Sequence, residues 1–186
     1  MHIQTHILSG WCIGNIFKLN ARERFLCMIA AALPDLDGLG ILINRDFYWN
    51  YHHVIAHGIL WTLICSAALA YFSLNRVKTF FIYFLLLHLH ILMDVFGSGE
   101  CWGIHYLWPF SGFILETKYS WAFASWQNIS AGCFFLFITI LIIYLARRSP
   151  LEYIMPQLDK KIIKFFELLK LKLITTFRRT GNLQDI

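Results

Sequence analysis

The stretch TFFIYFLLLHLHILMDVF, residues 79–96, decides the class of fold. A helix that crosses a bilayer needs about 20 consecutive, mostly apolar residues, and this stretch contains no Lys, Arg or Glu. His88, His90 and Asp94 interrupt the apolar run. Ionisable side chains inside a membrane segment are costly, so their presence there indicates function. The stretch therefore predicts a transmembrane helix that carries functional groups.

Four further apolar segments extend this prediction to most of the chain. His57–Leu74 and Ile129–Ala146 are also long enough to span a bilayer. Ile3–Phe17 and Ala21–Leu33 are shorter, and Pro34 stops the second, so we expect short, tilted or re-entrant helices there. Only 15% of the residues are charged, against about 25% in a soluble domain. We predict an all-α integral membrane helical bundle with three long spans, two short N-terminal helices and a C-terminal amphipathic helix.

The basic residues predict how this bundle is oriented. The chain has 16 Lys and Arg against 11 Asp and Glu, a net charge of +5. Clusters of them stand at segment ends, at Lys18/Arg22/Arg24, Arg76/Lys78 and Arg147/Arg148. Because loops rich in Lys and Arg stay cytoplasmic, these clusters mark the inner face. The loop 97–128 is then expected outside.

The end of the chain predicts a helix of another kind. We divide the chain into a membrane-embedded domain, residues 1–149, and a basic amphipathic cytoplasmic tail, residues 150–186. In the tail, apolar residues recur at helical spacing and lysines fall elsewhere around the wheel. The apolar set is Leu158, Ile162, Phe165 and Leu169, and the basic set is Lys160, Lys161, Lys164 and Lys170. Such a helix lies on an anionic membrane surface. We expect no nucleic-acid partner, because that would leave the apolar face exposed.

Histidine and aspartate residues gather in the outer half of the bilayer or at its outer surface. Counted from the nearest basic cluster at about 1.5 Å per residue, His6 and His90 lie roughly 18 Å into the membrane and Asp35 roughly 17 Å. Asp94 and His57 lie at roughly 24 and 28 Å by the same count. A lone histidine on an apolar helix is usually a packing residue. Several segments that deliver polar groups to the outer half of the bilayer instead predict one shared metal or catalytic site.

Two motifs supply carboxylates to this site. His90 and Asp94, in HILMD, are four residues apart and project from one face of a helix. There they can share a metal, or the carboxylate can hold the imidazole in one tautomer. Asp35 and Asp37, in PDLDG, can face one cation. Pro-Asp and Asp-Gly are also ordinary turn chemistry, so a purely structural role for PDLDG stays open.

A third motif, YHHVIAHG at residues 51–58, supplies histidines. A helix that begins by Val54 would place His53 and His57 on one face, with His52 reaching in from its start. The predicted metal ligands are His6, Asp35, Asp37, His52, His57, His90 and Asp94. Ligands of N and O alone suit Zn²⁺ first and Mn²⁺ second. A metal-activated water would be the nucleophile, with Asp35 or His53 as the general base.

The ordered motifs THILSG, ALPDLDG, HHVIAHG, HILMD and WGIHYLWPFSG, within residues 1–112, resemble one bacterial family. It is the family of LexA-regulated, inner-membrane-associated proteins that are proposed to be metal-dependent hydrolases. The resemblance implies a helical membrane fold, hydrolase activity and similarity to zinc-dependent phospholipase C. It maps the family's TH, PDxD, HRGxTHS and HxxxD elements onto Thr5/His6, residues 34–37, residues 52–58 and His90/Asp94.

The chain departs from the family pattern in its HRGxTHS element. His53, Val54, Ala56 and Gly58 stand where HRGxTHS has Arg, Gly, Thr and Ser. The lost Arg and Thr would weaken the binding of an anionic group, while His53 can supply a proton donor. The resemblance also implies that residues 108–110 form a lid beside the site. It makes His105 a candidate for substrate contact.

The leading hypothesis is a membrane-bound, metal-dependent hydrolase of the bacterial inner membrane whose site opens to the periplasmic side. We expect a phosphoester or lipid-like substrate, because the depth of the ligands suits a head group near the interface. A metal or proton transporter would also place His and Asp inside a bundle. It would need ionisable residues in the cytoplasmic half as well, and the three predicted long spans carry none there. A structural membrane protein that uses its histidines only for helix association is the third hypothesis.

Overall fold

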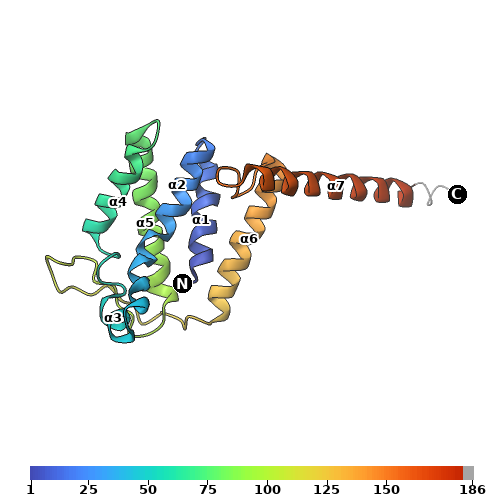
Figure 1. Cartoon of the computed structure of the whole chain (residues 1–186). Coiled ribbons are helices and arrows are strands. Elements are labelled where there is room, and N and C mark those ends of the chain that lie inside the picture. The colour runs from blue at the N-terminus through green and yellow to red at the C-terminus, as the bar shows by residue number, and fades with distance from the viewer. Residues whose placement is uncertain (182–186) are drawn as a thin grey trace. The chain divides into compact units, whose positions relative to one another are not determined.

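A computed structural model of the chain describes residues 1–181, and in that part it contains seven α-helices and one 3-10 helix (Figure 1). They are α1 (Ile3–Ile16), α2 (Ala21–Ala32), η1 (Leu33–Leu42), α3 (Arg45–Tyr51), α4 (Ile59–Tyr71), α5 (Arg76–Gly97), α6 (Trp126–Ala146) and α7 (Pro156–Gly181). The predicted all-α class is confirmed. Two compact units make up the chain, one from Met1 to Leu136 and one from Phe137 onward.

Within the described residues, three helical stretches are long and apolar enough to cross a membrane: Ala21–Leu42, Arg76–Gly97 and Trp126–Ala146. The sequence predicted the last two of these spans. The predicted third span, His57–Leu74, is wrong, and Ala21–Leu42 is long enough instead. Pro34 does end α2, because proline disrupts the hydrogen bonds of a continuing α-helix. It is tolerated in the first turn of η1, which carries the helical path on to Leu42. The fourth apolar helix, α4, has only 13 residues, since residues 52–58 are not helical.

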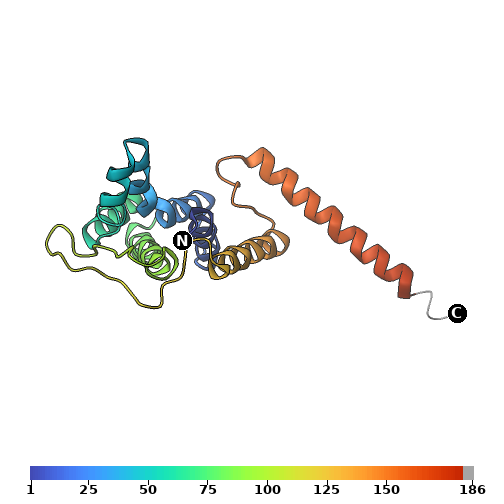
Figure 2. The same ribbon diagram turned by 90° about the horizontal axis from the view of Figure 1, so that it is seen from below.

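The first unit is built on two helix pairs that pack together. α1 packs on α2, α4 on α5, and α2 joins the pairs by packing on α5 (Figure 2). α1 approaches α2 through Gly10 and Gly14, where a Cβ on Gly10 would collide with the backbone of Cys27. Small residues four apart allow such close contact between membrane helices. The core between the pairs includes Cys27, Tyr83 and Leu86.

One end of this unit carries the basic clusters. The α1–α2 and α4–α5 turns meet there, since the backbone N–H of Leu74 donates to the Glu23 carboxylate at 3.0 Å. Glu23 also forms a capping box with Asn20 at the start of α2. We call this the basic end, and it contains Lys18, Arg22, Arg24, Arg76 and Lys78. The start of α1, η1, α3 and the end of α5 lie at the opposite end, which we call the histidine end (Figure 1).

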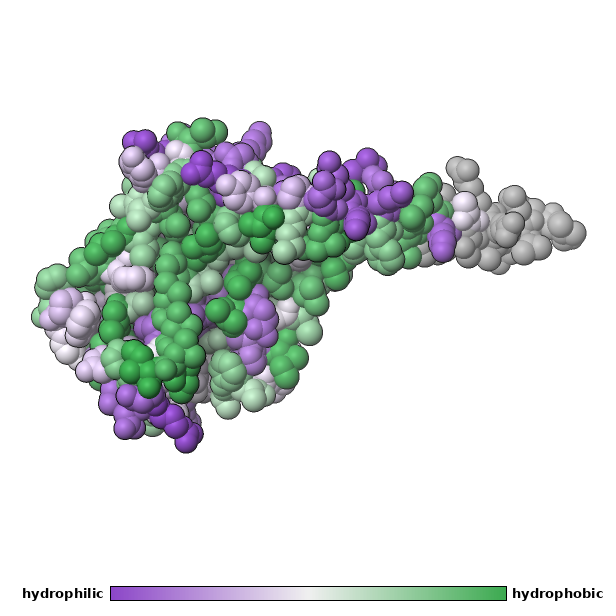
Figure 3. Space-filling model, viewed as in Figure 1, coloured by the Kyte–Doolittle hydropathy of each residue, from purple (hydrophilic) through white to green (hydrophobic). Residues whose placement is uncertain are grey.

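The surface of the bundle helices suits a lipid environment. Hydrophobic residues cover much of the face in view, and hydrophilic residues gather at its upper and lower ends (Figure 3). α6 is the most exposed of the three long stretches, with 11% of its most apolar window buried. It is held at its start by Asn128, whose amide donates to the Gly97 carbonyl at 2.7 Å.

The second unit joins the end of α6 to α7. Ser149 donates its backbone N–H to Asp159 in the first turn of α7, at 2.7 Å. Arg147 and Glu167 form an ion pair at 3.3 Å. α7 is the helix that the sequence predicts for the tail, and it leaves apolar side chains such as Leu158, Phe165 and Leu169 exposed. Residues 182–186 of the predicted tail lie outside the described residues.

Candidate metal centre

Four side chains from three segments converge at the histidine end. Asp35 comes from η1, His57 from the loop before α4, and His90 and Asp94 from α5. One ligand atom from each lies within 4.8 Å of those of the other three. His57, His90 and Asp94 are buried and Asp35 is half-buried. The fold therefore brings together four of the residues that the sequence predicts to share one site.

The distances within this four-residue group are short. His90 Nε2 lies 3.1 Å from Asp94 Oδ2 and 3.6 Å from Asp35 Oδ1. His57 Nε2 lies 3.3 Å from His90 Nε2 and 3.5 Å from Asp94 Oδ2. Two imidazole nitrogens and two carboxylates thus surround one small volume. That donor set is typical of Zn²⁺ and Mn²⁺ sites.

Hydrogen bonds on the outer side of each ring fix the tautomers. His90 Nδ1 lies 2.7 Å from the Ala31 carbonyl, which can only accept, so this nitrogen carries the proton. His57 Nδ1 lies 3.0 Å from Asp37 Oδ2 and donates in the same way. In neutral rings both Nε2 lone pairs then face each other and Asp94. Only a proton or a cation between them stabilises such an arrangement.

One further atom fits a cation. Asp35 Oδ2 is buried and has no hydrogen-bond partner among the described residues. A buried carboxylate oxygen without a partner is costly unless something else compensates it. A divalent cation bound by the four-residue group would interact favourably with this Asp35 oxygen and with the lone pairs of the two Nε2 atoms.

Asp37, predicted as a ligand, lies behind His57 and outside the four-residue group. Its Oδ2 accepts from His57 Nδ1 at 3.0 Å and from the backbone N–H groups of His53 and Ala56, each at 3.2 Å. Its Oδ1 accepts from His52 Nδ1 at 2.6 Å. Histidines that bind metals usually donate their other N–H to such a carboxylate. Asp37 therefore orients His57 and ties the 52–58 loop to η1.

His6 and His53 touch Asp94 from two further directions. His6 stacks on His90 with ring centroids 3.8 Å apart, and its Nε2 lies 3.2 Å from Asp94 Oδ1. His53 Nδ1 lies 3.1 Å from the Trp102 carbonyl, while its Nε2 lies 3.6 Å from Asp94 Oδ2. Burial and the neighbouring His57 lower the pKa of His53 well below its ordinary value. His53 is therefore neutral at physiological pH, with an unprotonated Nε2 toward Asp94.

The condition under which His53 and His57 would share a helix face, a helix that begins by Val54, is not met. His53 has a φ of +68°, which lies in the left-handed region, and α4 begins only at Ile59. The two rings thus reach Asp94 from a loop rather than from one helix face. The spacing of the two histidines left both possibilities open, and the hydrogen bonds to Asp37 hold this segment as a loop.

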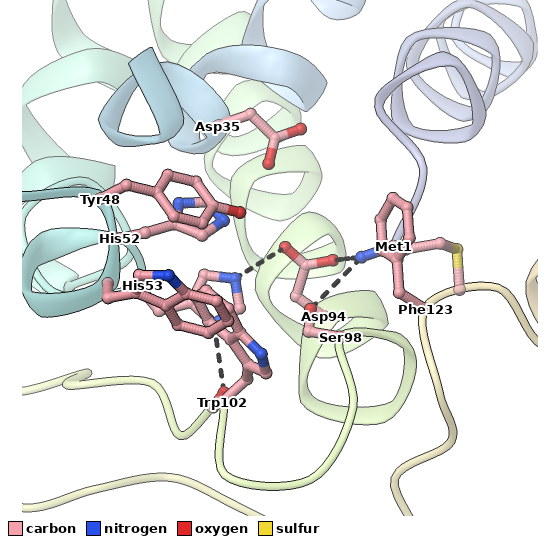
Figure 4. A pocket seen from close by; sticks show the side chains of 10 residues that line it. Met1, Asp35, Tyr48, His52, His53, Asp94, Ser98, Trp102 and Phe123 are labelled. Carbon is pink, nitrogen blue, oxygen red and sulfur yellow. Dashed lines mark hydrogen bonds and ion pairs between the residues drawn. The ribbon is translucent and has the colours of Figure 1, made fainter. Parts of the chain in front are cut away.

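A cavity of about 290 Å³ opens beside the group (Figure 4). Its lining consists of Met1, Asp35, Tyr48, Trp49, His52, His53, Asp94, Ser98, Trp102 and Phe123. Trp49 and Trp102 pack with ring centroids 4.7 Å apart, and Tyr48 stacks on His52 at 4.8 Å. Figure 4 also shows the amino group of Met1 in contact with Asp94. The cavity thus joins two carboxylates and two histidines to an aromatic wall.

The comparison with known families shows which family the chain belongs to. The family described as YdjM inner membrane protein matches residues 1–166. The chain belongs to this family. It is the LexA-regulated family that the motifs resemble, so that resemblance is confirmed. No curated protein and no solved structure matches the chain.

In this YdjM-family chain, three residues that the resemblance placed beside the site lie away from the cavity lining. Trp108 and Phe110 are exposed and are absent from the lining residues within the described chain. His105 donates its backbone N–H to the His53 carbonyl at 3.0 Å, and its side chain does not line the cavity either. Trp102 and Phe123 stand there instead. They lie in an irregular loop, where no periodicity reveals which aromatic residue faces a site.

Proposed function

We propose that this chain is a membrane-bound, metal-dependent hydrolase that cleaves a phosphoester in a lipid or lipid-like substrate. The observation that carries the proposal is the four-residue group, whose ligand atoms lie within 4.8 Å of one another. Two of its members, Asp35 and Asp94, line the cavity. Membership of the YdjM family, which is proposed to contain metal-dependent hydrolases, supports the hydrolase part of the proposal.

Asp35, His57, His90 and Asp94 are the residues that would hold the metal, with Zn²⁺ as the preferred ion and Mn²⁺ as the alternative. A divalent cation lowers the pKa of water from about 15.7 to about 7 and so supplies a nucleophile near neutral pH. His90 is held for this task by the Ala31 carbonyl and His57 by Asp37. His6 supports the group by stacking on His90.

Two groups on the cavity wall are suited to move a proton. His53 presents an unprotonated Nε2, because its Nδ1 donates to the Trp102 carbonyl. Asp35 lines the cavity and has one oxygen without a hydrogen-bond partner among the described residues. A general base must lie within hydrogen-bond reach of the proton that it removes. Both residues line the cavity, so a substrate bound there would lie next to them.

The lining of the cavity favours a lipid phosphoester. Tyr48, Trp49, Trp102 and Phe123 offer apolar area to the non-reacting part of a substrate. Tyrosine and tryptophan are enriched where a membrane protein meets the head groups. A head group held there would place its phosphate against the carboxylate-histidine wall.

The test is head-group release from mixed phospholipids by the purified full-length protein. We expect release that stops when a chelator removes the metal and returns with Zn²⁺ or Mn²⁺. Asp94→Ala should be inactive, whereas Asp46→Asn, on the exposed face of α3, should keep full activity. Activity that survives complete removal of metal would overturn the proposal, as would a metal-loaded protein that releases no head group from any phospholipid.

The proposal includes an orientation, with the histidine end toward the periplasm. The basic end supports it, since Lys and Arg mark the cytoplasmic side. A reporter fused after Gly112 should read periplasmic, and one fused after Arg148 should read cytoplasmic. The reverse pattern would place the site on the cytoplasmic face.

We propose further that α7 lies on the anionic inner surface of the membrane. Its exposed Leu158, Phe165 and Leu169 can enter the lipid while Lys160 and Lys164, elsewhere around the helix, stay in contact with head groups. The Arg147–Glu167 ion pair supports this by keeping α7 near the end of α6. Spin labels at positions 165 and 160 should report a buried and an exposed site, respectively. Equal exposure of both would contradict the arrangement.

A further inference from the structure

A second hollow lies at the basic end, on the outer side of α4 and α5. It is a groove of about 420 Å³, lined by Ala67, Ala70, Tyr71, Arg76, Val77, Phe80 and Phe81. Ala67 and Ala70 offer only methyl groups, so the surface is hollowed between them and the two phenylalanines. Apart from Arg76 and the Tyr71 hydroxyl, the lining side chains are apolar.

One arginine, Arg76, lines this groove, and a second, Arg22, lies over the ring of Phe72, the residue that follows Tyr71. The Arg76 guanidinium lies 4.9 Å from the centroid of the Tyr71 ring, and the Arg22 guanidinium lies 5.9 Å from that of Phe72. The nearby acid, Glu23, is buried and accepts from the backbone N–H groups of Asn20 and Leu74. Neither arginine forms an ion pair with an acid in the described part of the chain. Both positive charges are therefore available to a ligand.

The position of Arg76 is not explained by the stability of its own helix. Arg76 is the first residue of α5, and a cation at a helix N-terminus is unfavourable with the helix dipole. An anion beside Arg76 would interact well with both the guanidinium and the dipole. The arrangement therefore complements a negative charge.

We propose that this groove binds an anionic phospholipid, with an acyl chain along the apolar trough and the phosphate beside Arg76. Basic pockets between membrane helices at the head-group level bind anionic lipids in this way. The charge of Arg76 selects the head group, and the alanines of α4 make room for the chain. This site is separate from the four-residue group, which lies at the other end of the bundle.

The test uses the full-length protein in neutral detergent, titrated with phosphatidylglycerol and with phosphatidylcholine of identical acyl chains. The midpoint of thermal unfolding reports binding. We expect the wild type to respond at lower concentrations of phosphatidylglycerol than of phosphatidylcholine. Arg76→Gln should raise the phosphatidylglycerol concentration for half the effect about fivefold, and leave phosphatidylcholine unchanged. Arg45→Gln, an exposed arginine on α3, is the matched control and should change neither.

A second variant tests the groove itself. Ala67→Phe should fill the trough and weaken the response to both lipids, while metal content and head-group release stay at wild-type levels. An undiminished preference of Arg76→Gln for phosphatidylglycerol would overturn the role of the arginine, and unchanged lipid binding by Ala67→Phe would overturn the role of the groove. If Ala67→Phe instead converts a dimer to a monomer, the groove holds a second copy of the chain and the lipid proposal is wrong.

Discussion

The two ends of the first unit both contain buried ionisable residues, yet they use them differently. At the basic end, Glu23 caps the backbone N–H groups of Asn20 and Leu74, and Arg24 donates to the Leu19 carbonyl. At the histidine end, His57, His90 and Asp94 direct their polar atoms at one another. Burial of a charged residue therefore does not by itself mark a site. What marks it is whether the backbone already satisfies the polar atoms.

The same comparison bears on the choice between a hydrolase and a transporter. A transporter needs ionisable groups along a path through the bundle. At the basic end, the buried Glu23 carboxylate accepts from the backbone N–H groups of Asn20 and Leu74, and the buried Arg24 donates to the Leu19 carbonyl. These two charged side chains are thus used to hold helix ends together and not to extend the histidine cluster, which favours chemistry at one face.

Removal of a proposed metal ligand should have the largest effect on metal binding and activity. If it had no effect, the contrast between the histidine end and the basic end would be wrong. Asp94→Ala or His57→Ala deletes a group that faces the other ligand atoms, so we expect metal binding and head-group release to be abolished. Elemental analysis and the release assay check this. Either variant with normal metal content would show that the histidine end is a packing cluster.

Asp37→Asn should have the next largest effect. It keeps the size of the side chain but weakens the charged hydrogen bond to His57 Nδ1. Loss of such a partner typically lowers metal affinity about 10–100-fold. Competition with a zinc chelator measures this affinity, and Asp46→Asn serves as the control. If Asp37→Asn lost stability but kept its metal affinity, Asp37 would only hold the loop.

A smaller effect is expected from Trp102→Ala, which removes part of the cavity wall and leaves the backbone carbonyl that holds His53. Loss of one aromatic contact of about 0.5–1.5 kcal/mol should raise KM about two- to tenfold, with metal content unchanged. Phe110→Ala, outside the lining, should leave KM as it is. Equal effects of the two substitutions would place the substrate elsewhere.

A substitution at the basic end should lower the stability of the protein and leave its metal content unchanged. Glu23→Ala leaves the N–H groups of Asn20 and Leu74 without their acceptor, and a buried unsatisfied donor costs about 1–3 kcal/mol. We expect a lower midpoint of thermal unfolding with normal metal content. Glu100→Ala, an exposed loop acid, should not shift the midpoint. If Glu23→Ala lost its metal, Glu23 would support the metal centre at the opposite end, and the proposed difference between the two ends would be wrong.

Part of this site was predictable because depth along a helix can be counted from sequence. His90 and Asp94 follow from their spacing in α5, and counting from the basic clusters placed His6 and Asp35 at a similar level. The same count assumes regular helices. It therefore indicates which residues meet but not how their rings are oriented.

Other features depend on contacts that no local pattern encodes. The spacing of His53 and His57 resembles a helix, yet Asp37, distant in sequence, accepts hydrogen bonds from the loop and holds it open. Pro34 signals the end of α2, but the chain continues as the 3-10 helix η1, and together they form the helical stretch Ala21–Leu42. Whether Asp37 binds a metal or supports His57 is a matter of which side of the ring it lies on. Only the fold decides that.

The central claim is that the histidine end is a metal centre, and metal analysis of the purified wild-type protein tests it most directly. The protein should be extracted in mild detergent, dialysed and assayed for zinc and manganese against protein concentration. We predict a stoichiometric amount of one of these ions, with Zn²⁺ preferred. A normally folded protein that contains no such metal, and takes none up when Zn²⁺ or Mn²⁺ is supplied, would contradict the account.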